Sequence, residues 1–530
     1  MRRPVFKSSD EVAEMVFDGA TVTTIGMTLA GASEEILKAL EESFLSTGHP
    51  RNLTLVHSAG QSDRMRGIQH LAHEGMVARI IGSHWGLQPR WMEMISNNQV
   101  VAYCMPQGQM AQLYRSMACG LPGKLSKIGL GTFIDPRVEG GKMNERTRPL
   151  DDLIEVVTIG GEEYLLYKSI PLNFVIIRGT TADENGNITA EEEAIKHEIL
   201  PAVLAAKRFG GKVICQVKRV AEAHSLDPKQ VVVPGVFIDV VVVCRNPDED
   251  HRQSSSWVYD PAYSGQLRVP LSTAQPLPLT VRKVIGRRAM MYLEPDAIIN
   301  LGTGIPNDVV GPIAAEEGIM DEITITVESG VYGGIPAGGI DFGVAKNTDA
   351  LIEHQAQFDF YNGAGVDFTF MGAGEMDADG HVNATKMGKN ATGSGGFIDI
   401  TQCAKHVVFC STFTTGGLEV AFTDGKVSLV REGKIRKLVK NVQQISFNGI
   451  MARKREGQKV HFVTERCVFE LQKDGPVLME IAPGIRLEED ILAQMDFQPK
   501  ISHPLKVTNE AIYSQSRFGL KEILVAKRTL

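Results

Sequence analysis

The feature that most constrains the fold of this chain is an internal repeat. Residues 173–190 (NFVIIRGTTADENGNITA) align without a gap with residues 367–384 (DFTFMGAGEMDADGHVNA). Each copy is a short apolar run followed by an acidic turn, which begins at Asp183 in the first copy and at Asp377 in the second. This pattern is typical of a β-strand that ends in an Asx turn. The repeat predicts two similar domains, with a cleft where their strand ends face each other.

The length of the chain also requires more than one domain, because 530 residues are too many for a single core. We expect an N-terminal domain over residues 1–245 and a C-terminal domain over residues 281–530. Residues 246–280 between them are rich in Pro, Ser and charged residues, as is typical of an irregular connection.

Apolar runs of strand length alternate with longer amphipathic segments in both halves. We predict strands at residues 53–57, 100–104, 174–178, 213–217, 237–243 and 297–301, and helices at residues 9–20, 32–46, 190–209 and 284–294. Such alternation indicates an α/β fold with two similar, open, mostly parallel sheets and the active site in the cleft between them. Residues 416–530 are β-rich, which is compatible either with an extended sheet edge or with a subunit contact.

Residues 323–334 (ITITVESGVYGG) combine a β-branched strand, an acid and three glycines. Glu328 follows the strand at its carboxyl end, where ligands bind in open α/β sheets. The glycines beside it, Gly330, Gly333 and Gly334, would let a ligand approach the backbone closely. The acid is either a nucleophile that attacks the substrate or a group that holds the ribose of a dinucleotide. This stretch alone leaves both interpretations open.

Two further loops follow predicted strands. Gln107 comes just after the strand at residues 100–104 and is either a hydrogen-bond donor to a ligand or an ordinary surface residue in a turn. The GTGIPN loop at residues 302–307 opens a helix but lacks the third glycine of the dinucleotide fingerprint. The ribose interpretation of Glu328 is weakened accordingly.

Composition excludes several other classes of function. The net charge of −8 argues against nucleic acid or an anionic membrane as a partner. Seven scattered cysteines without a CxxC pair indicate free thiols in a reducing cytoplasm, and the N-terminus lacks the apolar region of a secretory signal. The thirteen histidines have no metal-binding spacing, and serine-hydrolase, zinc-protease and phosphate-loop motifs are missing from the sequence. We therefore expect neither a metal nor a tightly bound cofactor.

What remains is a carboxylate without a serine, a metal or an obvious base. A glutamate with an ordinary pKa of about 4.3 is ionised at neutral pH and needs no base. Because a carboxylate is a weak nucleophile, it requires an activated acyl substrate and binding energy from elsewhere in that substrate. A thioester with a large nucleotide portion meets both requirements.

The motifs together resemble those of the family I coenzyme A transferases. Residues 328–334 match the family's ExGxxGG signature, and residues 302–307 match its GxGxP loop on the CoA side. Residues 104–108 (CMPQG) resemble its PQG segment, and residues 393–399 (GSGGFID) resemble its GxGG(x)xD loop. The resemblance covers residues 10–500 and is closest to the single-chain, fused enzymes of the acetate/propionate type.

The resemblance implies transfer of CoA from a short-chain acyl-CoA to a carboxylic acid such as acetate, through a glutamyl-CoA thioester on Glu328. It implies that Gln107 donates to the oxyanion. The same resemblance implies further site residues: Gly395, Gly396 and Gly26 at the oxyanion and acyl group, and Gly302, Gly304, Ile305, Asn307, Gly330, Gly333 and Gly334 at coenzyme A. Coenzyme A and acyl-CoA are then substrates. Members of the family are homo-oligomers, often tetramers.

This chain departs from the family pattern at His57-Ser58, where two-subunit members carry paired asparagines, so the orientation of the nucleophile is left open. Two alternatives are also left open. One is an acyl-CoA thioesterase, if water reaches the glutamyl thioester. The other is a non-catalytic sensor of CoA or a sugar phosphate on the same fold.

Overall fold

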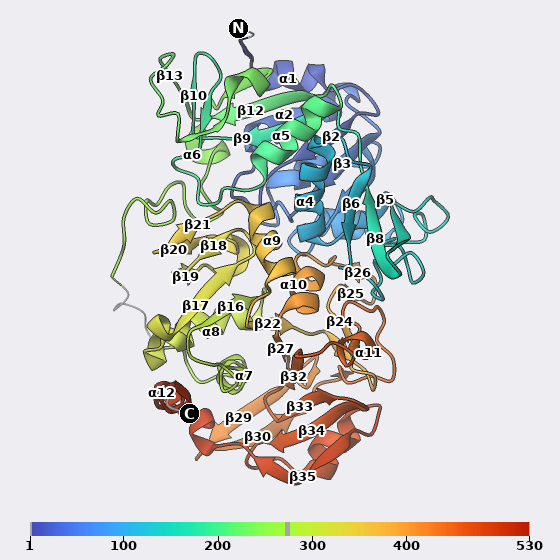
Figure 1. The fold of residues 1–530 in the computed structure, drawn as a ribbon, viewed down its shortest axis with the longest axis vertical. Coiled ribbons are helices and arrows are strands. Elements are labelled where there is room, and N and C mark those ends of the chain that lie inside the picture. The colour runs from blue at the N-terminus through green and yellow to red at the C-terminus, as the bar shows by residue number, and fades with distance from the viewer. Residues whose placement is uncertain (1–2, 271–275, 529–530) are drawn as a thin grey trace.

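The structure is a computed structural model that describes residues 3–270 and 276–528. Figure 1 shows two α/β halves one above the other, with the N-terminal half (blue to green) at the top and the C-terminal half (yellow to red) below it. Each half is built around its own central sheet.

The first sheet has eight strands, and every neighbouring pair in it is parallel. In spatial order the strands are β1 (Val5–Phe6), β15 (Val240–Val243), β12 (Lys212–Val217), β9 (Phe174–Arg178), β2 (Thr21–Thr24), β3 (Leu53–His57), β4 (Val77–Gly82) and β5 (Val101–Cys104). Its helices include α1 (Ser9–Met15), α2 (Glu34–Thr47), α3 (Pro89–Ser96), α4 (Gln107–Ala118) and α5 (Ile199–Arg208). The central strands are buried on both faces, as parallel sheets require.

The second sheet has ten strands, with a parallel centre, antiparallel pairs toward both edges and a parallel last pair at the C-terminal edge. In spatial order they are β21 (Ala350–Leu351), β18 (Val331–Tyr332), β17 (Ile323–Val327), β16 (Ala297–Leu301), β22 (Phe368–Gly372), β27 (His406–Cys410), β32 (Lys459–Val463), β33 (Cys467–Gln472), β34 (Gly475–Ile481) and β35 (Lys500–Val507). Its helices include α7 (Val281–Met290), α8 (Ile305–Glu317), α9 (His354–Gly363) and α10 (Phe397–Cys403). The β-rich C-terminal region thus extends a sheet edge through β33, β34 and β35.

The repeat in the sequence corresponds to a repeat in structure. The order β12-β9-β2-β3 in the first sheet is matched by β27-β22-β16-β17 in the second. The carboxylates of Asp183 and Asp377 each accept hydrogen bonds from the backbone N–H groups two and four residues further on, at 2.8–3.0 Å. The prediction of two similar, mostly parallel α/β domains is confirmed.

The predicted strands at residues 53–57, 174–178 and 297–301 coincide with β3, β9 and β16, whereas most of the other predicted elements differ at their ends. The largest error is the helix predicted at residues 190–209, because α5 begins only at Ile199. Three glutamates before it are engaged elsewhere, with Glu193, for example, held by Arg178 in a buried ion pair. Those interactions hold residues 190–198 in an irregular conformation.

The connection between the halves contains the short helix α6 (Pro247–Asp250) and no strand over its described residues, 246–270 and 276–280. Residues 271–275 of the predicted connection lie outside the described part. Trp257 and Tyr263 of the connection pack in an apolar cluster with Met27. We propose the domain boundaries 1–245 and 281–530, which agree with the strands that each sheet contains.

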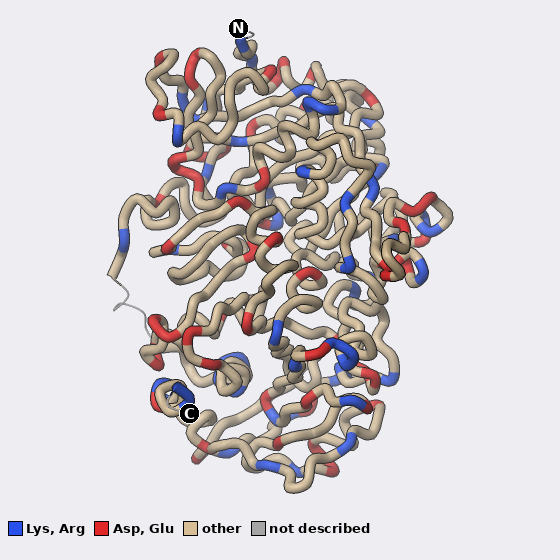
Figure 2. The backbone as a smooth tube through the Cα atoms, viewed as in Figure 1, with Lys and Arg blue, Asp and Glu red and all other residues tan. Residues whose placement is uncertain are grey.

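Basic and acidic residues are intermixed along the outer parts of the chain in both halves (Figure 2). Over the described residues, no helix is both long enough and apolar enough to cross a membrane.

Candidate active site

A cavity of about 590 Å³ lies between the two halves, lined by residues that follow the carboxyl ends of strands in both sheets. The first half contributes, among others, Met27, His84 and Gln107, and the second contributes Gly302, Glu328 and Gly396. The volume is in the range of small-molecule sites. A cavity is therefore present where the sequence predicts the site, in a cleft between the halves.

Glu328 follows β17 directly and faces this cavity with only 8% of its surface exposed. Within the described part of the chain it takes part in no ion pair. Its carboxylate is therefore free of a structural salt bridge within the described residues and can act on a ligand. The side chain of Gln107 lies close enough to lower the pKa of Glu328, so the two residues singled out from sequence lie together.

Burial raises the pKa of Glu328 from 4.5 to about 7. The nearby imidazole of His354 opposes this rise, the carboxylate of Asp399 adds to it, and the amide of Gln107 opposes it. The expectation of an ordinary, fully ionised glutamate at neutral pH was therefore wrong. Desolvation by the folded chain, which cannot be derived from local sequence, is the main reason.

Gln107 is the first residue of α4, and its position is fixed from the other half of the molecule. Its backbone N–H donates to the carbonyl of Gly395 at 2.9 Å. The carboxylate of Asp399 accepts from the backbone N–H of Gly108 at 3.0 Å and from the side chain of Gln109 at 2.7 Å. An acid at the N-terminus of a helix is stabilised by the helix dipole. Asp399 thus anchors the helix end that carries Gln107.

Gly395 and Gly396 differ in what they can offer a ligand. The N–H of Gly395 donates to the carbonyl of Ser83 at 2.9 Å, so it is already occupied. The N–H of Gly396 has no partner among the described residues. A Cβ added at Gly396 would lie 3.5 Å from the carboxyl carbon of Glu328, which places its backbone against the reacting group. Of the two, Gly396 is the one with a free donor beside Glu328.

The loop that opens α8 also lines the cavity. Gly302, Thr303, Gly304 and Asn307 face it, whereas Ile305 does not. The amide nitrogen of Asn307 donates to the carbonyl of Ala337 at 3.0 Å, and its buried oxygen has no partner among the described residues. Gly304 has a φ of 86°, a conformation that favours glycine, and precedes the first turn of α8.

The three glycines after Glu328 do not line the cavity. All three have positive φ, and an added Cβ would lie 2.1–2.2 Å from the chain's own atoms: the carbonyl oxygen of Ile352 for Gly330, the carboxylate of Asp349 for Gly333 and the carbonyl oxygen of Lys346 for Gly334. These glycines are thus required by the tight path of the chain on both sides of β18, with Gly330 before it and Gly333 and Gly334 after it. Glycine is needed at these positions because of the chain's own atoms, and not because a ligand approaches them.

Gly26 likewise lies just behind the cavity wall, which is formed by the next two residues, Met27 and Thr28. A Cβ at Gly26 would lie 3.0 Å from the carbonyl oxygen of Ala30, so a tight turn accounts for this glycine.

Several residues at the cavity were not identified from sequence. His84 lines it, and burial lowers the pKa of this imidazole to about 4, so it is neutral. Arg64 lines it with an exposed side chain that has no ion-pair partner within the described residues. Behind Gln107 lie His354 and Glu198, which are buried. None of these residues belongs to a short motif that marks a site.

The His57-Ser58 pair does not contact Glu328. His57 donates from Nδ1 to the carbonyl of Ala59 at 2.8 Å and accepts from the indole N–H of Trp85 at 3.1 Å. Burial lowers the pKa of His57 to about 4, in keeping with a neutral ring. The hydroxyl of Ser58 donates to the carboxylate of Glu198. These residues therefore reach the site only through others.

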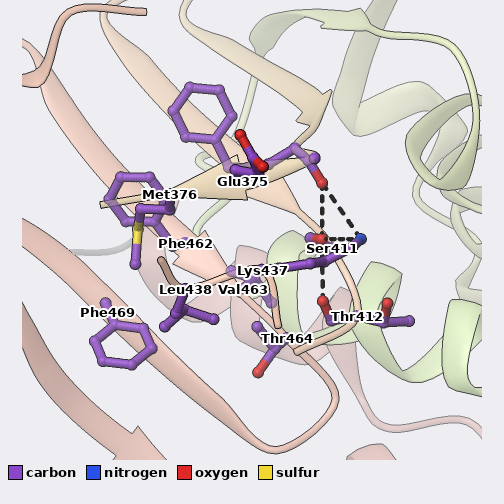
Figure 3. Close-up of a pocket in the computed structure, with 13 residues that line it drawn as sticks. Glu375, Met376, Ser411, Thr412, Lys437, Leu438, Phe462, Val463, Thr464 and Phe469 are labelled. Carbon is purple, nitrogen blue, oxygen red and sulfur yellow. Dashed lines mark hydrogen bonds between the residues drawn. The ribbon is translucent and has the colours of Figure 1, made fainter. Parts of the chain in front are cut away.

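A second cavity in the C-terminal half is much smaller, about 30 Å³, which is room for only a few water molecules. Figure 3 shows its lining of mainly apolar side chains and, at one side, Lys437 and Ser411, which are joined by a 2.7 Å hydrogen bond. The cavity is too small for a nucleotide thioester. The large cavity that contains Glu328 is thus the candidate active site.

Comparison with known proteins gives a consistent result. A model of the family described as "Coenzyme A transferase" matches residues 6–244. The chain is 44% identical over 525 residues to caffeate CoA-transferase of Acetobacterium woodii, covering 98% of this chain and 99% of that protein. It is 40% identical over 523 residues to acetate CoA-transferase YdiF of Escherichia coli strain K12, covering 98% and 96%.

Solved structures agree. The apoenzyme of acyl-CoA transferase YdiF from Escherichia coli O157:H7 superposes with a TM-score of 0.92 at 37% identity, over 98% of this chain and 97% of that one. A thioester complex of the same enzyme with CoA superposes with a TM-score of 0.91, also at 37% identity and with the same coverage.

Proposed function

This chain belongs to the coenzyme A transferase family and moves CoA between an acyl-CoA and a carboxylate, and we propose that it does so through a glutamyl-CoA thioester on Glu328. The observation that carries the proposal is the position of Glu328. It is a buried carboxylate without an ion-pair partner in the described part of the chain, at a strand end in the cavity between the halves.

The reaction begins when a carboxylate oxygen of Glu328 attacks the acyl-CoA carbonyl. The C–S bond breaks, CoA leaves as a thiolate, and an acyl-glutamyl anhydride remains. The thiolate then attacks the carboxyl carbon of Glu328, which releases the first carboxylate product and leaves the glutamyl-CoA thioester. A second carboxylate reverses these two steps and departs as the new acyl-CoA. No proton is gained or lost over the cycle.

Each attack creates a negative oxygen that needs hydrogen-bond donors. We assign this role to the side-chain amide of Gln107 and the free N–H of Gly396, because both lie next to the carboxyl group of Glu328. Preorganised donors of this kind supply a large share of the stabilisation in acyl transfer.

Coenzyme A would lie along the loop that opens α8, with Gly302, Gly304 and Asn307 at the cavity surface and Ile305 behind it. Arg64, at the exposed part of the lining, offers a cation to the phosphates of CoA or to an incoming carboxylate. Gly330, Gly333 and Gly334 support the site through the backbone that holds Glu328.

We propose a short-chain acyl-CoA as donor and acetate or a similar acid as acceptor, with no tightly bound cofactor. The relative named an acetate CoA-transferase supports acetate as a substrate class. Because another relative is named a caffeate CoA-transferase, acetate should be compared with a larger acid such as caffeate as acceptor. A matrix of acyl-CoA donors against carboxylate acceptors distinguishes the two.

A thioesterase is the competing activity, because water could attack the same glutamyl thioester. The low exposure of Glu328 favours transfer over hydrolysis. Product analysis with and without acceptor acid separates the activities. In the same assay, Glu328→Ala is expected to abolish transfer while CoA binding persists, and transfer at the wild-type rate by this variant would refute the proposal.

We also propose a cytoplasmic homo-oligomer, with a tetramer as the expected form. All seven cysteines are free, as in a reducing compartment. Large apolar side chains are exposed near the C-terminal strands, among them Val430 at 66% and Val507 at 62%, and such side chains are available to a subunit contact. Light scattering on the purified protein tests the oligomeric state.

A further inference from the structure

Behind the proposed oxyanion donor lies a buried chain of hydrogen bonds that crosses between the halves of the molecule. Nε2 of Gln107 and Nε2 of His354 are 3.0 Å apart, and Nδ1 of His354 is 2.6 Å from a carboxylate oxygen of Glu198. The side chains of His354 and Glu198 are each 1% exposed. The other oxygen of Glu198 accepts from the hydroxyl of Ser58.

The charge of Glu198 fixes the tautomer of His354. Burial alone would raise the pKa of Glu198, but the imidazole of His354 and the hydrogen bonds that Glu198 accepts from His354 and Ser58 leave that pKa below its ordinary value. An ionised carboxylate can only accept, so Nδ1 of His354 must carry a hydrogen. Nε2 of His354 faces the amide nitrogen of Gln107 at 3.0 Å, and because an amide nitrogen can only donate, this arrangement requires a neutral imidazole with Nε2 as the acceptor.

The tautomer of His354 in turn orients Gln107. A side-chain amide can rotate by half a turn and exchange its oxygen for its nitrogen. An acceptor at Nε2 of His354 requires the –NH₂ group of Gln107, whose second N–H is then available to the carboxyl group of Glu328. The reversed amide would place its oxygen against an anion.

We propose that His354 and Glu198 are positioning residues of the transfer reaction, which hold the amide of Gln107 with its donors toward the reacting carboxyl group. This inference rests on the proposed role of Glu328 and Gln107. It also gives Ser58 a function, since its hydroxyl holds the far side of Glu198. The pair acts through Gln107 and makes no contact with the substrate.

A merely structural role for the buried pair would have a different consequence. His354 and Glu198 would then only join the two halves, and their loss would lower stability without changing the turnover of the folded enzyme. The chain offers a matched control in His251 of the connection, which lies 3.2 Å from the amide of Gln216 and 3.4 Å from the carboxylate of Glu193. All three residues are buried and outside the cavity lining.

The test compares Glu198→Gln, His354→Asn and the control His251→Asn by steady-state kinetics and thermal unfolding of the full chain. Glu198→Gln is nearly isosteric but frees the imidazole to change tautomer, and the corresponding change in a Ser-His-Asp triad costs activity with the geometry intact. We expect kcat to fall about 10- to 100-fold in Glu198→Gln and in His354→Asn. This loss is smaller than the roughly 10²–10³-fold loss of kcat expected when a whole oxyanion donor is removed. The KM for acyl-CoA should stay within about twofold, as expected when only transition-state binding is lost. His251→Asn should leave kcat unchanged.

A double-mutant cycle supplies the decisive readout. Adding His354→Asn to Gln107→Ala should cost less than about twofold further in kcat, because the donor through which His354 acts is already gone. Multiplicative losses, or an unchanged kcat in Glu198→Gln, would overturn the inference. If His354→Asn does not fold, Glu198→Gln with Gln107→Ala completes the cycle. Activity that survives Glu328→Ala would instead refute the proposed function.

Discussion

The backbone N–H of Gln107 donates to the carbonyl of Gly395 across 2.9 Å, although 288 positions of sequence separate the two residues (395 − 107). This bond joins the first turn of α4 in one half to the loop before α10 in the other. The side chain of Gln107 and the carboxyl group of Glu328 meet at the same place. The site is thus assembled only when the two halves are docked, and the predictions below depend on that assembly.

The acid limb of the pH profile should report the ionisation of Glu328. Only the carboxylate attacks the thioester, and the pKa of Glu328 is raised to about 7 by burial. We therefore expect kcat/KM to rise with pH and to reach half of its maximum near pH 7. An acyl-pantetheine donor, which has no phosphate that titrates, isolates the enzyme's own group. A profile that is flat between pH 5.5 and 9 would contradict this assignment.

The same raised pKa makes Glu328 a source of instability at high pH. The folded-state pKa of about 7 lies above the unfolded value of 4.5, so the folded protein binds the proton more tightly and loses stability as pH rises from 4.5 to 7. Glu328→Gln removes this dependence. The unfolding free energy of the variant should exceed that of the wild type by up to about 3 kcal/mol at pH 8 and by little at pH 4.5. Equal differences at both pH values in denaturant titrations would count against a buried, perturbed carboxyl group.

Gln107→Ala should lower kcat by about 10²–10³ with little change in KM, because an oxyanion donor acts mainly in the transition state. Gln112 on the same helix is a suitable control. It is also buried, donates to Asp359 at 2.7 Å and does not line the cavity. Gln112→Ala should keep kcat within about twofold. Similar losses in the two variants would mean that damage to α4, and not a missing donor, explains the effect.

Two glycine substitutions should separate function from folding. Gly396 has a φ of −80°, which any residue adopts, and an added methyl group would lie 3.1 Å from Phe358, 3.2 Å from Ile400 and in contact with the carboxyl carbon of Glu328 at 3.5 Å. Gly330 has a φ of 104°, and its added methyl group would clash with the carbonyl oxygen of Ile352 at 2.1 Å. Gly396→Ala should lose activity with a smaller fall in Tm, because only side-chain ends must move there, whereas Gly330→Ala should lower the Tm by several degrees. The reverse ranking of the two Tm values would show that these roles are assigned wrongly.

Local sequence was sufficient where a residue's role depends on its own neighbours along the chain. The strand at residues 323–327 and the acid after it could be predicted because β-branched residues form β17 and the chain order places Glu328 at its carboxyl end. The duplication likewise predicted two similar sheets. The ends of elements were less predictable, since Glu193 and its neighbours use their carboxylates in tertiary ion pairs where a helix was expected.

Local sequence was insufficient where a role depends on what the docked halves bring together. His354 and Glu198 are 156 positions apart and carry no motif, yet they form one hydrogen-bonded unit. The pKa of Glu328 depends on burial by both halves. The three glycines after Glu328 illustrate the same limit, because their requirement for glycine comes from residues 346–352 of the neighbouring segment and not from a ligand.

The central claim is a covalent bond between Glu328 and coenzyme A, and its most direct test is mass spectrometry of the enzyme incubated with acyl-CoA in the absence of acceptor acid. We predict that the peptide containing Glu328 carries a CoA adduct, that borohydride converts this thioester to an alcohol at the same residue, and that an acceptor acid removes it. An unmodified Glu328 peptide, or an adduct on a different residue, in a sample that transfers CoA normally would contradict the account.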